Sequence, residues 1–459
     1  MSGSPDTERA VMPVLSDLVT RVGELVEDAR KNGQATPEIQ TRYRRKYRGF
    51  RYTESGPTYE GWSTVAETQE SYQRAQYELW AKVGGLPEFK EATRLARANP
   101  TTQPRVEGML RTFVPRLVGL YLAECPVDVE SIVREVGQSW RDEPATVGVR
   151  AELEGLILEP ENIQVSSGDS VLRLRQTVLA DAETELFPFD IGGLDITPPS
   201  AMMEVTERIP PSTTVQPYLD RAIAALRLFS VSGVSYRKYT VLGASPADLF
   251  YGASFRPGHS RPVGGGRRLT RNDAERLADY WPLFYPRVPA PFYAEGGSSG
   301  GKLAVAYDYY CDSLLHGRSP ADRISHAIMG LEALLHGGES EVAYTIKMRS
   351  AKLLAAVGYD PVSVATTVGA AYRVRSSYVH GNPRPSCLEP RPKKGDASSG
   401  ELLDRVLEYL RGVVLVHLLP TVDPDALRSR ADAAMLNRDA DEQLRTSLRR
   451  FEPVVKPRG

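Results

Sequence analysis

The chain has 459 residues, a hydrophobic fraction of 41%, a charged fraction of 25% and a formal net charge of -1. This length predicts two or three domains, and the near-neutral charge means that nucleic-acid binding requires a local basic patch. The three cysteines are far apart and form no CxxC pair, which argues against a disulfide framework or a cysteine-based zinc site.

Residues 1–140 predict a mostly helical N-terminal region. Apolar residues recur at helical spacing over 8–31, the stretch 64–98 continues in that style, and a third apolar stripe runs from Val106 to Tyr121. A short helix is expected from Val127 to Gln138. The polar start of the chain is unlike a secretory signal. The sequence contains no run of about 18 apolar residues, so no membrane span is expected. We therefore expect a cytoplasmic protein.

Residues 141–295 predict a small mixed α/β region. A helix is expected from Gln216 to Phe229. Alternating apolar and polar residues predict short strands within Val147–Leu158, Ile163–Val165, Ser170–Thr177, Met202–Ile209 and Val234–Leu242. Residues 255–301 are expected to be irregular and to end in a hinge or linker, EGGSSGGK.

Residues 302–420 predict an all-α bundle, and 421–459 a peripheral helical tail. The five helical segments expected in the bundle are Leu303–Leu315, Ala321–Leu335, Glu341–Val357, Pro361–His380 and Gly400–Leu419. The predicted fold class is thus α+β, with a mostly helical N-terminal region, a mixed α/β middle region and a helical C-terminal bundle.

An R-x4-H motif, Arg375 and His380, lies at the end of the fourth of these helices, where Gly381 is placed to stop it. The second helix contains LEALL, the third MRSAKLL, and the fourth YRVRSSYVHG. In this order the three segments resemble the HEPN superfamily, and within it the ApeA-like HEPN group of bacterial antiphage defence proteins. The resemblance covers residues 302–420.

The resemblance implies a homodimer whose two motifs face each other, and RNA cleavage that leaves a cyclic phosphate end and needs no metal or other cofactor. The residue types suit that reaction, because histidine exchanges protons near neutral pH and arginine holds phosphate oxygens. Residues five apart on a helix point about 140° away from each other. Arg375 and His380 of one chain therefore need not converge, whereas an isologous dimer would bring each motif against its twin.

Several residues around the motif have two interpretations. Arg373 forms an R-x6-H spacing with His380 on nearly the same helix face, and is either a helper or the alternative arginine. Ser376 stands where many HEPN nucleases carry Asn, Asp or His, although serine is common in the ApeA-like group. Glu332, within LEALL, is either an orienting residue for the motif arginine or a structural partner. Tyr378 either stacks on a base or packs within the fold.

Two basic segments are candidates for RNA contact. The run RYRRKYRGFRY, residues 42–52, interleaves cations with aromatic rings, as single-stranded RNA binding requires; the alternative is a solvated helix end. The loop after the motif, 384–394, must emerge near His380 and is expected to guide RNA. The candidate RNA-binding residues are Arg44, Arg45, Lys46, Arg384, Arg391, Lys393 and Lys394.

The remaining motifs are weaker. GGSSGGKL resembles a P-loop, but Leu303 stands where Ser or Thr should be and no apolar strand precedes it, so a linker is the better interpretation. The histidines lack metal-ligand spacing, and no metal or cofactor is predicted. His326 and His336 are expected to cap or pack within helices, and His417 to be a hydrogen-bonded core residue.

The HEPN resemblance implies an endoribonuclease that acts in abortive infection on tRNA or other cellular or phage RNA. The N-terminal regions would sense a phage-derived trigger or position RNA. The alternative is a non-catalytic, dimerising regulator that binds nucleic acid or nucleotides, and a third possibility is a structural adaptor. A regulator would shift RNA on a gel and leave it intact, whereas an adaptor would neither shift nor cleave RNA.

Overall fold

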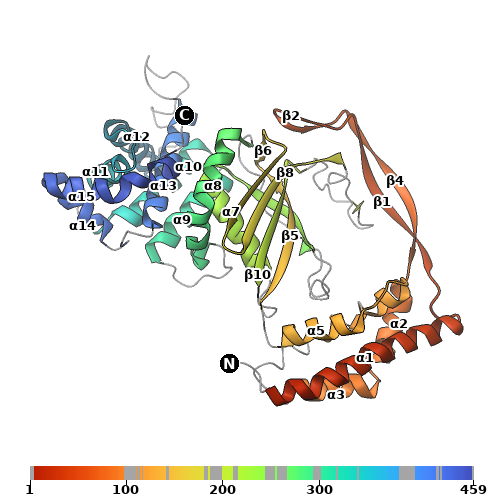
Figure 1. Ribbon diagram of the computed structural model, residues 1–459. Helices are drawn as coiled ribbons and strands as arrows, with labels where there is room; N and C mark the ends of the chain where they lie inside the picture. Colours follow the sequence, from red (N-terminus) through yellow and green to blue (C-terminus); the bar gives the residue numbers. More distant parts are fainter. Residues whose placement is uncertain are drawn as a thin grey trace.

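The computed structural model describes residues 5–97, 110, 114–115, 117–140, 144–179, 185–186, 199–209, 215–242, 254–255, 266–292, 301–316, 319–338, 341–381, 398–419, 423 and 426–456. They form helical units at the two ends of the molecule and a six-stranded sheet between them (Figure 1). The predicted α+β class is confirmed. No helix among the described residues is long and apolar enough to cross a membrane.

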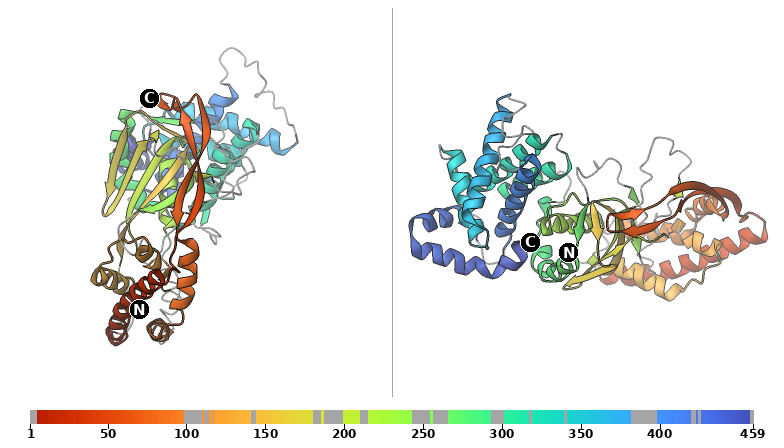
Figure 2. Two further views of the ribbon diagram at one scale, coloured as in Figure 1. Left: turned by 90° about the vertical axis from the view of Figure 1, so that its right-hand side faces the viewer. Right: turned by 90° about the horizontal axis from the view of Figure 1, so that it is seen from above.

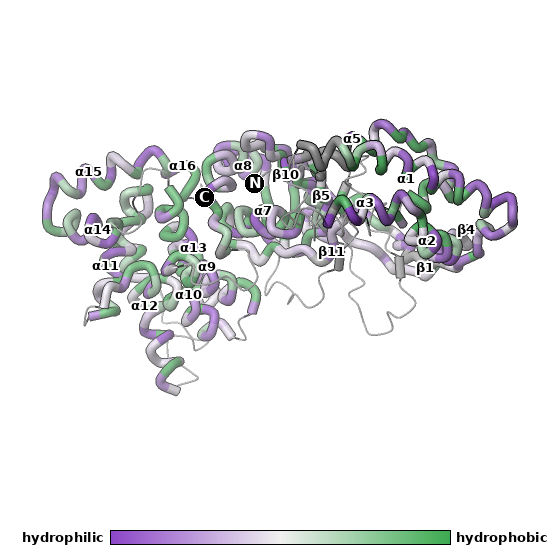
Figure 3. The backbone as a smooth tube through the Cα atoms, turned by 90° about the horizontal axis from the view of Figure 1, so that it is seen from below, coloured by the Kyte–Doolittle hydropathy of each residue, from purple (hydrophilic) through white to green (hydrophobic). Residues whose placement is uncertain are grey.

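The N-terminal unit is helical, with a hydrophobic core of its own. Leu18 and Val22 of the first helix and Leu79 of the second are almost completely buried in this core. Hydrophobic and hydrophilic residues alternate along these helices, as expected for amphipathic segments that bury one face (Figure 3). The helices are α1 (Pro5–Lys31), α2 (Gln73–Val83), α3 (Pro87–Arg97) and α5 (Val129–Trp140).

A long antiparallel ribbon interrupts this helical region. Strands β1 (Glu38–Arg48) and β4 (Gly61–Ser71) pair along their whole length, and β9 (Glu185–Leu186) pairs with the other edge of β1. The expected helical structure is therefore wrong for residues 64–71, which belong to β4. The basic run 42–52 is likewise not a helix end. The described side chains of β4 are all exposed or half-buried, so this strand has no apolar alternation to reveal it.

The far end of the ribbon is anchored to the central sheet through Tyr52. This residue lies in β2 (Arg51–Thr53), which forms a hairpin with β3 (Gly56–Thr58). The Tyr52 hydroxyl donates to the Ser200 carbonyl at 2.8 Å and accepts from the Leu158 amide at 3.0 Å. The ribbon thus bridges the N-terminal helices and the sheet (Figure 1).

The central sheet is six-stranded, with the order β12-β11-β5-β10-β8-β7 and antiparallel pairing throughout. Every second residue is buried on its inner face, for example Val149 and Ala151 on β5 and Leu172 and Leu174 on β8. The strands are β5 (Ala145–Glu154), β7 (Asn162–Ser167), β8 (Ser170–Gln176), β10 (Ala201–Ile209), β11 (Ser235–Leu242) and β12 (Ser254–Phe255). Strand β6 (Leu156–Leu158) pairs separately, in parallel, with β13 (Arg267–Leu269).

Helices α7 (Gln216–Phe229) and α8 (Arg271–Phe284) cover one face of this sheet (Figure 1). Helix α7 has the predicted bounds. Helix α8 contradicts the expectation that residues 255–301 are irregular. Thr270 begins it with a capping box, because its hydroxyl accepts from the Asp273 amide at 3.2 Å and the Asp273 carboxylate accepts from the Thr270 amide at 3.0 Å. The short 3-10 helices η2 (Tyr285–Arg287) and η3 (Ala290–Phe292) follow.

The C-terminal bundle contains all five predicted helices, with ends that differ from the prediction by a few residues. They are α9 (Gly301–Leu315), α10 (Pro320–Leu335), α11 (Val342–Ala355), α12 (Pro361–Val379) and α13 (Ser399–His417). The tail forms α14 (Leu427–Leu436), α15 (Arg438–Leu448), η5 (Arg449–Phe451) and α16 (Glu452–Val455). The tail packs against the rest of the chain, since Leu427, Leu448 and Val455 are fully buried.

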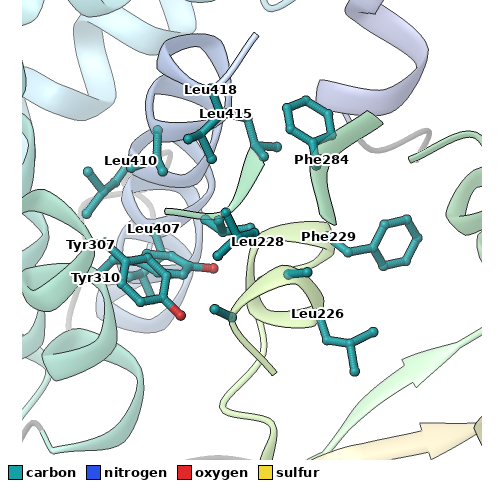
Figure 4. Packing of buried hydrophobic residues seen from close by; sticks show 14 of the residues in the cluster. Leu226, Leu228, Phe229, Phe284, Tyr307, Tyr310, Leu407, Leu410, Leu415 and Leu418 are labelled. Atoms are coloured by element: carbon teal, nitrogen blue, oxygen red, sulfur yellow. The ribbon is translucent and has the colours of Figure 1, made fainter. Parts of the chain in front are cut away.

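The sheet region and the C-terminal bundle share one hydrophobic core. Figure 4 shows Phe229 of α7 and Phe284 of α8 in the same cluster as Tyr310 of α9 and Leu410 of α13. The side chains that cap the end of α7 reinforce this junction. Tyr280 donates to the Ala225 carbonyl and Tyr310 to the Arg227 carbonyl, at 2.9 and 2.8 Å.

Arg411 of α13 is the most completely buried charged residue at this junction, with an exposed fraction of 0%. It forms an ion pair with Glu408, and its Nη1 atom donates to the Leu228 carbonyl at 2.8 Å. Its Nη2 atom also donates to the Val455 carbonyl of α16. Tyr359 donates to Glu408 at 2.5 Å. One buried guanidinium therefore connects the sheet region, the bundle and the C-terminal tail.

Candidate functional site

Helices α10 and α12 carry the candidate site, and both have well-defined ends. Ser319 caps α10 through the Asp322 amide at 3.2 Å, and Asp360 caps α12 through the Ser363 amide at 2.7 Å. Gly381 follows α12 with φ +79°, and its amide donates to the Tyr378 carbonyl at 3.2 Å. The predicted stop at Gly381 is confirmed, because this left-handed conformation suits glycine.

Arg375 of α12 forms an ion pair with Glu332 of α10, with 3.2 Å between Nη2 and Oε2. The two side chains are 25% and 19% exposed. Burial raises the pKa of the Glu332 carboxyl, and the nearby charges of Arg375 and His336 oppose this rise. The Oε1 atom of Glu332 and the Nε atom of Arg375 are buried and have no hydrogen-bond partner in the part of the chain that the structure describes. The pair therefore has unused hydrogen-bonding capacity.

His380 and Arg373 lie differently from Arg375. Both are exposed, whereas Arg375 is half-buried against α10. The His380 amide donates to the Ser376 carbonyl at 3.1 Å and closes the last turn of α12. Ser376 itself is half-buried. This arrangement fits the expected divergence of residues five apart on a helix, and leaves the His380 imidazole facing solvent at a helix end.

Tyr378 contacts α10. Its side chain is 38% exposed, and its hydroxyl donates to the Asp322 carboxylate at 3.2 Å. Asp322 lies 3.8 Å from the Nδ1 atom of His326, whose ring stacks on Tyr309 of α9 with 6.1 Å between ring centroids. Asp322 and His326 thus lie beside the motif without being among the predicted site residues. Their spacing of four residues on one helix face was the available signal.

The two basic segments are not brought to the motif by the described structure. Arg384, Arg391, Lys393 and Lys394 lie outside the described residues. Arg44, Arg45 and Lys46 lie on β1, in register with Val65, Thr64 and Ser63 of β4, and the Lys46 side chain is exposed. In Figure 1 this ribbon is at the opposite end of the molecule from α12. An RNA that contacted both would have to span the molecule.

The other expectations concern histidines and the P-loop-like segment. His417 is 5% exposed, and its Nδ1 atom donates to the Val413 carbonyl at 2.8 Å, which confirms a hydrogen-bonded core residue. Burial lowers the pKa of His417 to about 4. His336 packs at the end of α10, where its carbonyl accepts from Arg428 at 3.0 Å. Before α9, which begins at Gly301, the last described element is the 3-10 helix η3 rather than a strand. The described residues contain no cluster of three side chains suited to a metal ion.

Comparisons with models of protein families, with curated proteins and with solved structures found no match to this chain. Its function therefore has to be argued from the arrangement of these residues.

Proposed function

We propose that this protein is a metal-independent endoribonuclease of the HEPN type, acting as a homodimer. The observation that carries the proposal is the end of α12, where His380 is exposed and Arg375 is held by Glu332. The likeness of segments 324–335 and 371–382 to the ApeA-like HEPN group supports the same reaction, and suggests a cytoplasmic role in antiphage defence. A phage-derived trigger would then start RNA cleavage that halts the infected cell.

The proposed reaction is attack of an RNA 2′-OH on the adjacent phosphate. The O2′–P bond forms and the P–O5′ bond breaks, which leaves a 2′,3′-cyclic phosphate and a 5′-OH. One proton leaves O2′ and another must reach O5′. In a two-fold dimer, His380 of one protomer would act beside Arg375 of the other, and its imidazole would take up the proton from O2′ and deliver one to O5′, since imidazole exchanges protons near neutral pH.

Arg375 would stabilise the additional negative charge on the phosphate oxygens during this attack. A guanidinium has five N–H donors, and the ion pair with Glu332 uses one of them. The pair fixes the direction of the guanidinium plane, and donors remain for a phosphate. Glu332 would therefore act as a positioning residue, without touching the RNA.

The test is a cleavage assay on total RNA and purified tRNA in EDTA. It compares the wild type with His380→Ala and Arg375→Ala, each checked for folding and for dimerisation. We expect cleavage that survives EDTA, leaves cyclic phosphate ends and disappears in both variants. Equal cleavage by all three proteins would overturn the assignment of the site. Binding of intact RNA without cleavage, in the presence of phage lysate as a source of trigger, would favour the dimerising regulator instead.

A further inference from the structure

The outer face of the six-stranded sheet carries an ordered array of cations. On β5, β8, β10 and β11 the residues that alternate with the core residues point to this face, away from the core that α7 and α8 cover. Two of them, Met202 and Glu152, are buried, at 3% and 9% exposed, so the accessible part of the face lies around the other charged residues. In the left view of Figure 2 the sheet lies in front of the C-terminal helices, with the ribbon beside it. The outer face is therefore turned away from the bundle.

Strand register places the charged residues in two neighbouring rungs. The first rung runs Gln164, Arg173, Glu204, Arg150 and Thr240 across β7, β8, β10, β5 and β11. The second runs Asn162, Arg175, Met202, Glu152 and Lys238 across the same strands. Four cations thus accompany two carboxylates, and Arg208 and Glu154 add one charge of each sign at the ends.

Glu204 holds two of these arginines in place. Its Oε1 atom accepts from Arg150 Nε at 2.8 Å and lies 3.8 Å from Arg175 Nε. The Glu204 side chain is 18% exposed, whereas those of Arg150 and Arg175 are 38% and 29% exposed. The carboxylate therefore lies beneath the guanidinium groups, which remain accessible from outside the sheet.

Arg173 lies opposite Glu204 on the neighbouring strand, but its described hydrogen bond goes to a neutral side chain. It is exposed, and its Nε atom donates to the neutral Gln164 side chain at 2.8 Å. Among the described residues, no carboxylate forms an ion pair with Arg173. Exposed ion pairs stabilise a fold by only about 0–1 kcal/mol, so stability gives little reason for this concentration of arginines.

We propose that this face binds the phosphate backbone of single-stranded RNA through Arg150, Arg173, Arg175 and Lys238. Neighbouring strands lie about 4.8 Å apart, so Arg173 on β8 and Lys238 on β11, three strands apart, are too far from each other to converge on one small anion, although Arg150 and Arg175 both approach Glu204. A flexible chain of phosphates can meet several of these cations. Among the outer-face positions of the sheet's described strands, Phe255 of β12, in register with Lys238, is the one aromatic residue, so most of the array offers phosphate contacts rather than base stacking.

The inference rests on the proposed function, because it identifies the surface that holds the substrate. The binding test uses the full chain with His380→Ala, so that RNA stays intact, and a short unstructured, fluorescently labelled RNA. Anisotropy titrations over a range of salt concentrations give the affinity and its salt dependence. The test variant adds Arg173→Gln and Lys238→Gln. The matched control adds Lys90→Gln and Arg94→Gln on α3, where both residues are exposed.

Each phosphate contact contributes about 0.7 to the slope of log affinity against log salt for single strands. Loss of two contacts should lower the slope by about 1.4 and weaken binding about 25-fold at 0.1 M salt, whereas the control should bind like its parent. Glu204→Gln removes one negative charge from the array and should tighten binding. Weaker binding by Glu204→Gln, or equal effects of the test and control pairs, would overturn the proposal.

A cleavage assay with His380 intact separates this inference from the proposed function. Arg173→Gln with Lys238→Gln should raise KM and leave kcat unchanged, because these residues hold RNA away from the reacting phosphate. If the sheet binds RNA that the wild type never cleaves, the proposed function fails and the inference stands. If RNA is cleaved and the sheet variants bind RNA with unchanged affinity, the inference fails and the proposed function stands. No RNA binding at all would refute both.

Discussion

Arg375 and Glu332 form an ion pair across α10 and α12, with 3.2 Å between Nη2 and Oε2, in the half of the motif helix that faces the bundle. His380, five residues later, faces solvent. The two residues of the motif therefore have different surroundings, and their substitution should have different consequences. Changes at His380 should affect the reaction alone, whereas changes at Arg375 should affect both the reaction and the packing of two helices.

The Glu332 carboxyl should make stability depend on pH. Burial raises its pKa in the folded chain, so its contribution is fully present below the unfolded pKa of about 4.3 and is lost as pH rises through the folded value. The free energy of unfolding of the wild type, relative to Glu332→Gln, should therefore fall between acidic and neutral pH. Arg375→Gln removes the opposing cation and should move this loss to higher pH. Urea unfolding across that range measures both effects, and parallel curves for the wild type and Glu332→Gln would contradict the argument.

Arg375 and Arg373 should contribute unequally to RNA cleavage. Arg375→Ala removes a guanidinium that Glu332 orients, and should lower kcat by about 10²–10³, as loss of a preorganised electrostatic donor does. Arg373 is exposed, and Arg373→Ala should lower kcat less than about tenfold. Single-turnover cleavage of one tRNA substrate measures the two effects. The opposite ranking would make the R-x6-H spacing the functional one.

Mixing two inactive variants tests whether the site forms across the dimer. If Arg375 of one protomer acts with His380 of the other, a heterodimer of Arg375→Ala and His380→Ala retains one intact site. Equal mixing and exchange of subunits should then restore about a quarter of the wild-type activity, because half of the dimers are mixed and each has one of two sites. Fluorescence energy transfer would show whether the subunits exchange. If exchanged mixtures stay inactive, either both residues of a site come from one chain, or the reaction requires both copies of Arg375 and both copies of His380.

Arg411→Met should be strongly destabilising. It leaves Glu408 without its cation in a largely buried place, and removing one partner of such a pair typically costs about 3–5 kcal/mol. The carbonyls of Leu228 and Val455 also lose a donor. Adding Glu408→Gln should recover part of the loss. Arg445→Met, in an exposed pair with Asp441, is the control and should change the free energy of unfolding by less than about 1 kcal/mol.

His417 should destabilise the protein in acid. Burial lowers its pKa to about 4, below the ordinary value of 6.5, so its contribution is present above pH 6.5 and is lost as pH falls through about 4. The pKa difference corresponds to about 3 kcal/mol. His417→Leu removes the titrating group, and its free energy of unfolding should fall less between pH 7 and pH 4 than that of the wild type. Equal acid sensitivity would show that other groups control this transition.

The helices of the C-terminal bundle could be predicted because their apolar residues recur over ten or more positions and each helix has a clear boundary, although α13 is buried on all sides from Tyr409 to His417. Pro320, Pro361 and Gly381 mark helix ends in the sequence, and the structure begins or stops helices at these residues. The R-x4-H motif could likewise be placed at the end of α12. These features depend on residues close together in the chain, which a sequence displays directly.

The ribbon and helix α8 could not be predicted in the same way. Strands β1 and β4 are stabilised by pairing with each other, over a polar sequence that carries no alternation signal. In α8, Pro282 lies near the end and a Gly-rich segment precedes the helix, so the Thr270–Asp273 capping signal was overlooked. The backbone carbonyls that Arg411 contacts are 44 to 183 residues away, and such contacts follow from packing rather than from any local pattern.

The position of Arg411 limits how this chain can be divided. Its guanidinium requires acceptors from α7 before the bundle and from α16 at the end of the described chain. A fragment excised at the boundaries of the HEPN resemblance would leave that charge in an apolar interior with Glu408 as its one remaining partner among those described. The bundle therefore cannot be moved unchanged into another protein. Joining residues 302–420 to a different N-terminal region would require a redesigned interior around Arg411. Evolution that exchanges N-terminal regions would meet the same constraint.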